Sequence, residues 1–295
     1  MIYLQSFLDG IVLGGVYATI GVGLSLSYGV MNIINWAHGE LLMVSMFISY
    51  VLITMFGFDP YLTMFINIPV MFAIGYLLQK NVFSTILKKD KDPEPMSVLI
   101  ATAGLSMILI SVSTMIFGSN PIAAVSKYTG KTIWIGDIVF SVPRLISFVI
   151  AIIATVGLYV LLQKTELGRS LRATAQNRHV AKLMGINTDM AYNIAFGMSL
   201  ALVGIAAALL IPNYTVYPKV GGNYGMKSFV IVLLGGKGNV PGALIGGFVI
   251  GIIERIGAVI FTESYAMMLV FALFIVILLV IPDGIFSLKL RRQKS

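Results

Sequence analysis

Residues 165–189 have the sequence TELGRSLRATAQNRHVAKLMGINTD, the longest strongly polar stretch in an otherwise apolar chain. Two uncharged runs flank it, residues 145–163 and 192–211, and each has about the 20 apolar residues that a helix needs to cross a bilayer. Between Lys164 and Asp189 there are five basic residues and two acidic ones. Because an excess of Lys and Arg marks short loops on the cytoplasmic side, the pattern predicts two membrane spans joined by a cytoplasmic loop.

Local signals predict a short helix inside this loop, at residues 178–184. Asn177 can act as its N-cap, and Gly185 can take the left-handed conformation that follows a helix C-terminus. Thr188 would then cap the next membrane helix, with Asp189 in the first turn. The short helix is either a solvated connector or, if it is held at the membrane surface, a docking element for another protein. Its apolar side consists of Val180, Leu183 and Met184, and its polar side of Arg178, His179 and Lys182.

The composition is that of a polytopic membrane protein. Of the 295 residues, 58% are hydrophobic and 11% are charged, whereas soluble domains carry about 25% charged residues. The net charge of +8 does not indicate nucleic-acid binding, because the basic residues lie in loops and in the tail rather than in a patch interleaved with aromatic side chains. With no cysteine, the chain has no disulfide, cysteine-based zinc site or thiol nucleophile.

The uncharged runs predict an all-α transmembrane bundle with about eight spans and one broken, glycine-rich membrane segment. A glycine-rich helix occupies the first two-thirds of residues 10–37, and its Gly10 and Gly14 form a small-xxx-small pair that permits close helix approach. The other predicted spans cover residues 41–58, 61–79, about 20 residues from position 96, 145–163, 192–211, 243–261 and 266–281.

Loops and turns give the predicted orientation. Residues 80–96 carry four lysines and two prolines and are predicted to be cytoplasmic, as is the basic tail at residues 289–294. The sequence GSNP at residues 118–121 ends the fourth span. Residues 120–143 form a predicted outer loop, with a small hairpin within residues 133–142. This arrangement places the N-terminus outside.

The regular pattern of spans breaks after Pro212. Residues 228–236 form a run of only nine uncharged residues, and the sequence GGKGNVPGALIGG follows at residues 235–247. Non-helical backbone inside a membrane is tolerated only where it is buried in protein or lines a wet cavity, so this segment is a candidate lining of a transport pathway. A cytoplasmic tail requires the segment to cross in a broken form, whereas a re-entrant segment would leave the tail outside. The glycines do not satisfy the phosphate-loop pattern GxxxxGK[ST].

Few polar side chains fall within or beside the predicted spans. Residues 28–40, YGVMNIINWAHGE, bring several to the place where the first span ends, and these either cap the next helix or act in transport. Glu254 and Arg255 lie inside a predicted span, where ionisable residues usually face a bundle interior or a cavity. The alternative is that both lie near a membrane interface. The candidate pathway residues are Asn32, Asn35, His38, Glu40, Gly235, Gly236, Gly242 and Glu254.

The sequence shows no catalytic set of residues and no obvious carrier for a coupling ion. It contains no Ser/His/Asp or paired-carboxylate set, and His38 and Glu40 do not share a helix face, so we expect no catalytic residue, metal site or cofactor. Ion-driven transporters usually carry carboxylates or histidines in their spans, and the first six predicted spans are nearly free of them. Energy is therefore expected from partners that hydrolyse ATP. The competing interpretations are an ion-coupled carrier that uses Glu40, Glu254 and Arg255, and a non-transporting scaffold.

Three blocks of the sequence resemble the inner-membrane permeases of bacterial branched-chain amino acid ABC importers, of the LivH type. The blocks are residues 28–40, residues 165–187 and the sequence LLGGKGNVPGALIGG at residues 233–247. The resemblance extends over essentially the whole chain, in the same order and spacing. It implies a single permease domain over residues 1–295, in the bacterial cytoplasmic membrane, with a cytoplasmic coupling loop at residues 164–189. Related sugar and urea permeases share parts of the pattern, so urea or another small solute is the alternative cargo.

The resemblance also implies partners and an alternating-access mechanism driven by ATP. A second, paralogous permease subunit, two ATP-binding cassette ATPases and an extracytoplasmic substrate-binding protein would complete the importer, with membrane lipid around it. Residues 179–185, HVAKLMG, are similar to the EAAxxxG element by which such permeases engage their ATPases, with His179 in place of the acidic residue and Val180 in place of the first alanine. The implied coupling residues are Gly168, Arg169, Arg172, Asn177, Ala181, Gly185 and Asn187.

Overall fold

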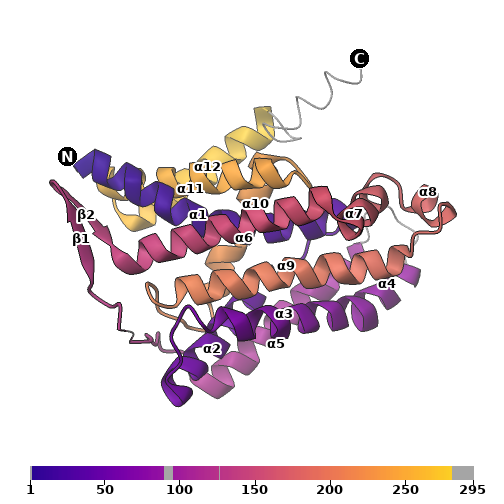
Figure 1. Ribbon diagram of the computed structural model, residues 1–295, viewed down its shortest axis with the longest axis horizontal. Coiled ribbons are helices and arrows are strands. Elements are labelled where there is room, and N and C mark those ends of the chain that lie inside the picture. The colour runs from indigo at the N-terminus through magenta and orange to yellow at the C-terminus, as the bar shows by residue number, and fades with distance from the viewer. Residues whose placement is uncertain (1, 90–95, 126, 281–295) are drawn as a thin grey trace.

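The computed structural model describes residues 2–89, 96–125 and 127–280, which form a bundle of helices with one small hairpin (Figure 1). The tail at residues 289–294 lies outside the described residues, as does the proline-containing part of the predicted loop at residues 80–96. The helices are α1 (Ile2–Met31), α2 (His38–Phe56), α3 (Met64–Leu78), α4 (Ser84–Lys89), α5 (Met96–Phe117), α6 (Val142–Lys164), α7 (Glu166–Gln176), α8 (Arg178–Leu183), α9 (Thr188–Leu210), α10 (Val220–Gly235), α11 (Val240–Ile260) and α12 (Glu263–Val280). The strands are β1 (Thr132–Ile135) and β2 (Ile138–Ser141).

Within the described residues, seven helices are long and apolar enough to cross a membrane: α1, α2, α3 with its continuation, α5, α6, α9 and α11. The helix α12 contains a shorter apolar segment, and α10 has 16 residues. The predicted polytopic helical bundle with about eight spans is thus confirmed. The third predicted span was too short, because a π-helical turn at Gln79–Phe83 joins α3 to α4. Residues 80–89 contain no glycine or proline that would end the helix.

The centre of the bundle consists of α1 and α9. In each of these helices 78% of the apolar window is buried, against 17% in α5, which therefore lies at the periphery. Glycines let α11 pack against α1. A Cβ added to Gly14 of α1 would lie 2.7 Å from the Cα of Phe248, and a Cβ added to Gly247 of α11 would lie 2.5 Å from the Cα of Ala18. The close approach predicted at Gly10 and Gly14 is confirmed, and backbone proximity of this kind stabilises helix pairs in lipid.

The two ends of the bundle differ in structure. The N-terminus and the β1–β2 hairpin lie at one end, which we call the outer end, and α7 and α8 lie at the other, which we call the coupling end (Figure 1). The hairpin predicted within residues 133–142 is confirmed, and Gly136 takes the left-handed conformation in its turn (φ 63°). A second left-handed glycine, Gly118, follows α5 at the predicted end of the fourth span (φ 77°).

A half-buried ion pair stabilises the loop between α2 and α3 at the outer end. Lys127 Nζ lies 2.7 Å from Asp59 Oδ2, and the Tyr128 hydroxyl donates to the same oxygen at 3.0 Å. The Tyr61 amide donates to the other carboxyl oxygen at 3.1 Å. Burial acts to raise the pKa of Asp59, but these hydrogen bonds outweigh it and hold the pKa below its ordinary value.

The glycine-rich segment at residues 235–247 is mainly helical, which corrects the prediction of non-helical backbone. The helix α10 runs to Gly235, a short turn follows, and α11 begins at Val240 with Pro241 in its first turn. Asn239 caps α11 by accepting a hydrogen bond from the Gly242 amide at 3.1 Å. Sequence reasoning gave too much weight to the glycine density, which instead serves close packing between the two helices.

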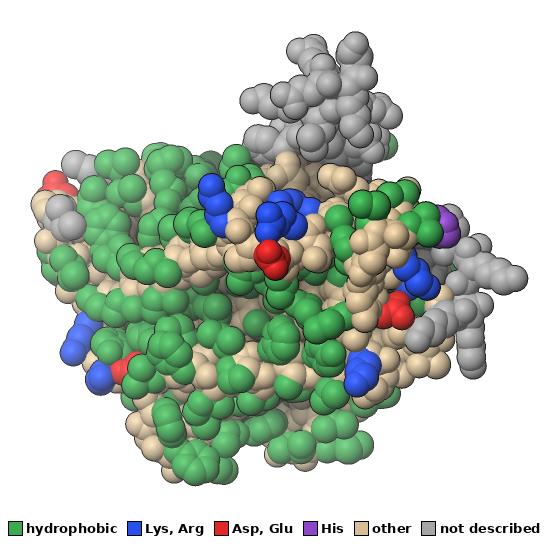
Figure 2. Space-filling view, turned by 45° about the vertical axis from the view of Figure 1, so that its right-hand side comes forward, with side chains coloured by type: hydrophobic (Ala, Val, Ile, Leu, Met, Phe, Trp, Pro, Cys, Tyr) green, Lys and Arg blue, Asp and Glu red, His purple; other side chains and the backbone are tan. Residues whose placement is uncertain are grey.

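The face of the bundle drawn in Figure 2 is mostly hydrophobic, with charged side chains in a few small groups. Large apolar side chains on α5, such as Met107, Ile108 and Met115, are also exposed, with exposed fractions of 60–85%. Apolar exposure on this scale is what a lipid-facing helix requires.

Candidate functional site

The coupling end is a helical hairpin that a glycine draws close to the membrane helices. Thr165 caps α7 by accepting a hydrogen bond from the Gly168 amide at 3.0 Å. A Cβ on Gly168 would lie 2.1 Å from the Leu162 carbonyl oxygen, so only glycine fits the tight passage from α6 to α7. The sequence predicted α8 but not α7, whose amphipathic residues 166–176 were read as loop.

The boundaries of α8 follow from the predicted signals. Asn177 Oδ1 accepts a hydrogen bond from the Val180 amide at 3.0 Å, and Gly185 has a left-handed backbone with φ 84°. The predicted cap of α9 was wrong by one residue: Asn187 Oδ1 accepts from the Met190 amide at 3.0 Å, and Thr188 is the first helical residue. An Asn at this position satisfies a free helical amide as well as Thr does, so either residue fitted the pattern.

One side of α8 is apolar and exposed. The exposed fractions of Val180, Leu183 and Met184 are 51%, 75% and 78%, whereas Ala181 is buried at 3%. Ala181 therefore packs α8 onto the hairpin, and the other three face outward. Beside this edge, residues of α7 and α9 and the turn at Gly185 line a groove of about 340 Å³.

The arginines of the coupling end have different surroundings. Arg169 forms an exposed pair with Glu166 at 3.2 Å, one turn apart on α7. Arg178 Nη2 lies 2.8 Å from Asp189 Oδ1 and its guanidinium lies 4.7 Å from the centre of the Tyr192 ring, so it ties α8 to α9. Arg172 is half-buried, and its Nη1 has no hydrogen-bond partner among the described residues.

The first group of candidate pathway residues lies at the connection from α1 to α2. Asn32 is exposed and has a positive φ of 53°, and Asn35 Oδ1 accepts a hydrogen bond from the Ala37 amide. His38 is fully buried, and its Nε2 lies 3.2 Å from the carbonyl oxygen of Ile20 in the middle of α1. Glu40 is buried and contacts Ser106 of α5. The structure thus brings these four residues into one region.

Three other candidates, Gly235, Gly236 and Gly242, form the turn between α10 and α11. A Cβ on Gly242 would lie 1.9 Å from the Gly235 carbonyl oxygen, and Gly236 has φ 87°. A Cβ on the nearby Gly238 would lie 2.7 Å from the Cα of Gly29, so the turn also packs on α1. These glycines therefore act in helix packing in this structure.

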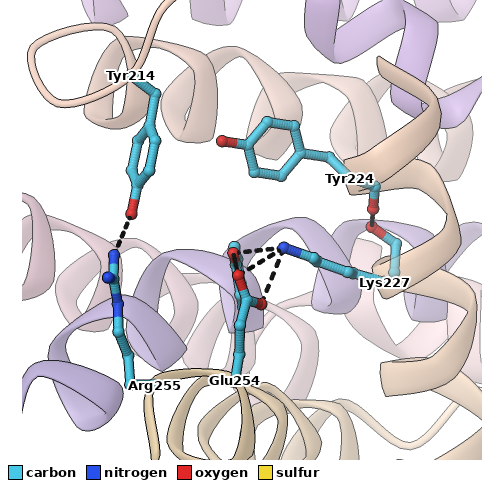
Figure 3. Close-up of polar contacts among 7 residues, drawn as sticks. Tyr214, Tyr224, Lys227, Glu254 and Arg255 are labelled. Carbon is cyan, nitrogen blue, oxygen red and sulfur yellow. Dashed lines mark hydrogen bonds and ion pairs between the residues drawn. The ribbon is translucent and has the colours of Figure 1, made fainter. Parts of the chain in front are cut away.

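Glu254 is in a different place, inside the bundle between α1, α10 and α11 (Figure 3). Lys227 Nζ donates to Glu254 Oε1 at 2.9 Å and lies 2.8 Å from Oε2. The Tyr17 hydroxyl donates to Glu254 Oε1 at 3.1 Å and accepts from Lys227 Nζ at 2.8 Å. The exposed fraction of the side chain is 7% for Lys227 and 21% for Glu254. A buried pair of this kind needs its hydrogen bonds to offset the desolvation of both charges.

Arg255 extends this group toward the outer end. Its Nη2 donates to the Tyr214 hydroxyl at 3.0 Å, and Tyr214 belongs to the turn after α9, where Val216 pairs with Ile122 of the outer loop. The buried ring of Tyr224 lies near the ammonium of Lys227, with 5.8 Å between Nζ and the ring centre. We call Tyr17, Tyr214, Tyr224, Lys227, Glu254 and Arg255 the polar cluster.

Sequence reasoning missed Lys227 and the tyrosines of the polar cluster. It took Lys227 as the boundary of a membrane segment that began at residue 228, whereas α10 begins at Val220. One signal in the sequence could have found the pair: Lys227 lies in one apolar run and Glu254 in the next. Unlike charges in neighbouring spans usually pair.

Comparison with known proteins identifies the family. Residues 6–278 match the family model described as branched-chain amino acid transport system / permease component. The chain is 31% identical to the high-affinity branched-chain amino acid transport system permease proteins LivH of Salmonella typhimurium and BraD of Pseudomonas aeruginosa, over 96% of this chain and 95% of each relative. It is 27% identical to the probable branched-chain amino acid transport permease protein LivH of Methanocaldococcus jannaschii, over 98% of this chain and 95% of the relative.

No solved structure matches the chain. The apolar helices and the relatives together show a multi-pass protein of the inner membrane. The chain belongs to the family of permease components of branched-chain amino acid transport systems.

Proposed function

We propose that this chain is a permease subunit of an ATP-binding-cassette importer and carries branched-chain amino acids across the cytoplasmic membrane. The observation that carries the proposal is the apolar edge of α8, because Leu183 and Met184 expose most of their surface at the end of the bundle. Exposed apolar side chains that none of the described residues covers are typical of a protein interface. The relatives of this chain are named as branched-chain amino acid permeases, and the proposed cargo is taken from those names.

In this proposal α8 is the lever on which the ATPases act. Its ends are capped by Asn177 and by the turn at Gly185, and the Arg178–Asp189 pair joins it to α9. Because α9 is one of the two central helices, a displacement of α8 reaches the core of the bundle directly. The other implied coupling residues lie in α7, in α8 or at the cap of α9: Gly168, Arg169, Arg172, Ala181 and Asn187.

The cargo would move by alternating access. The glycine contacts between α1, α10 and α11 let these helices slide, because glycine surfaces do not interlock as larger side chains do. Nucleotide binding to the ATPases supplies the difference in free energy between the two states, so this chain needs no catalytic site of its own. The candidate polar groups along the transport pathway are Asn32, Asn35, His38, Glu40 and Glu254. The branched aliphatic side chain of the cargo gains about 0.8 kcal/mol of transfer free energy for each CH₂ that leaves water.

The proposal requires partners of defined kinds: two ATPase subunits at the coupling end, a second paralogous permease subunit beside this one, and a substrate-binding protein at the outer end. Residues 1–295 act in it as a single permease domain, with residues 164–189 as the coupling loop.

The test is the affinity of the ATPases for the purified permease pair. Leu183→Asp places a charge in the apolar edge without a buried contact to lose, and we expect a loss of about 2 kcal/mol, or roughly 30-fold in Kd. Trp134→Asp is the matched control, because Trp134 is equally exposed (70%) but lies on β1 at the outer end. Equal ATPase affinity in the two variants would contradict the assignment of α8.

A further inference from the structure

The polar cluster holds two cations and one carboxylate. Lys227 is paired with Glu254 at 2.8 Å, whereas the partner of Arg255 is the neutral hydroxyl of Tyr214. Arg255 forms no ion pair with any residue that the structure describes. A cation inside a membrane span is costly unless an anion neutralises it, so the cluster is short of one negative charge.

One buried hydrogen-bond donor of the cluster, on Arg255, lacks an acceptor, and the hydroxyl of Tyr224 is a second available donor. Arg255 Nε is buried and has no partner within residues 2–89, 96–125 and 127–280. Tyr224 is 6% exposed, and its hydroxyl forms no hydrogen bond in the same part of the chain. In Figure 3 this hydroxyl points toward Tyr214, the residue that Arg255 contacts. Because buried donors are nearly always paired in folded proteins, the unpaired guanidinium nitrogen of Arg255 indicates a missing acceptor. Glu254 Oε2 also has no hydrogen bond, but its charge is already met by Lys227 at 2.8 Å.

We propose that the polar cluster is the subsite for the carboxylate of the transported amino acid. Arg255 supplies the charge and a donor, Tyr224 a second donor, and the Lys227–Glu254 pair fixes the electrostatic field around them. A carboxylate offers two acceptor oxygens and one negative charge, which is what the cluster lacks. The inference rests on the proposed transport function and adds to it a chemical basis for recognising amino acids rather than uncharged solutes such as urea.

The position of the cluster suits a ligand that arrives from outside. Tyr214 and Arg255 lie toward the outer end, and the Glu254 side chain remains 21% exposed, so the cluster is not sealed within the bundle. A carboxylate there would move Arg255 from a neutral partner to a charged one, which strengthens the hydrogen bond.

The experiment compares leucine with leucinamide, which lacks the carboxylate. Binding of each compound is measured by saturation-transfer NMR on the permease–ATPase complex in nanodiscs of zwitterionic lipid, without the binding protein. We expect leucine to bind at least about tenfold more tightly than leucinamide, because a charge-assisted hydrogen bond contributes about that factor. Arg255→Gln should abolish this preference and Tyr224→Phe should reduce it. Lys219→Gln, an exposed cation on the outer turn, is the matched control and should preserve it.

Each outcome decides the inference. An unchanged leucine-to-leucinamide ratio in Arg255→Gln would overturn it, provided that the variant complex elutes and melts like the unmodified one. A wild-type complex without any preference, in which Arg255→Gln instead lowers the retention of anionic lipid, would show that Arg255 serves a lipid phosphate and would also overturn it. The proposed transport function would survive either result, because it fails only if ATP-dependent uptake itself is absent.

Discussion

Two ion pairs in this protein have the same nitrogen–oxygen distance, 2.8 Å, in opposite surroundings. Lys227 and Glu254 lie inside the bundle, with side-chain exposures of 7% and 21%, whereas Arg178 and Asp189 lie at the coupling end, with exposures of 43% and 50%. Water screens the second pair and leaves it a net contribution of at most about 1 kcal/mol. The first pair has given up most of its hydration, so each charge depends strongly on the other.

The difference shows how the molecule separates two tasks. At the coupling end, apolar side chains are exposed and charged ones are solvated, which suits a surface that another protein covers. In the polar cluster, charged side chains are buried beside Tyr17 and Tyr224, which suits a place where a charged group is handled inside the membrane. The nitrogen–oxygen distance alone does not distinguish these two pairs; the exposed fraction of their side chains does.

Removing one partner of the buried pair gives the largest expected effect on stability. Glu254→Ala removes the carboxylate that pairs with the buried ammonium of Lys227, and we expect a loss of about 3–5 kcal/mol in the free energy of unfolding. The double variant Lys227→Met with Glu254→Leu removes both charges and should recover most of that loss. Thermal unfolding in detergent measures both, and a double variant as unstable as the single one would contradict the coupling of the pair.

The same change in the exposed pair should have the smallest effect. Asp189→Asn leaves Arg178 in contact with water and with the ring of Tyr192, so we expect a loss below about 1 kcal/mol that vanishes at high salt. The measurement is the melting temperature at low and at high ionic strength. A loss as large as that of Glu254→Ala would show that burial does not separate the two pairs.

Sequence reasoning succeeded where the determining interactions are local. The helix α8 could be predicted because Asn177 and Gly185 act within a few residues of themselves, through a cap and a left-handed turn. The hairpin of β1 and β2 was found for the same reason, from the turn at Gly136. The spans followed from hydrophobic length, which the membrane imposes on each helix separately.

Sequence reasoning failed where the determining interaction crosses the fold. Lys227 appeared to lie just before a short membrane segment rather than within it, because nothing near it in the sequence shows that Glu254 neutralises it 27 residues later. The glycines at residues 235–247 appeared to break helices, whereas Gly242 and Gly247 allow the close contacts of α11 with α10 and α1. A glycine-rich sequence looks the same whether its glycines break a helix or allow close packing of a helix, and only the packing partner distinguishes the two roles.

The central claim is that force enters this chain at α8 and that the chain moves no cargo without it. The most direct test is uptake of radiolabelled leucine by proteoliposomes that contain both permease subunits and the binding protein, with and without the ATPases and ATP. The account predicts concentrative uptake only with ATPases and ATP, and its loss in Leu183→Asp. Concentrative uptake that continues without ATPases and stops when an ion gradient is collapsed would contradict it.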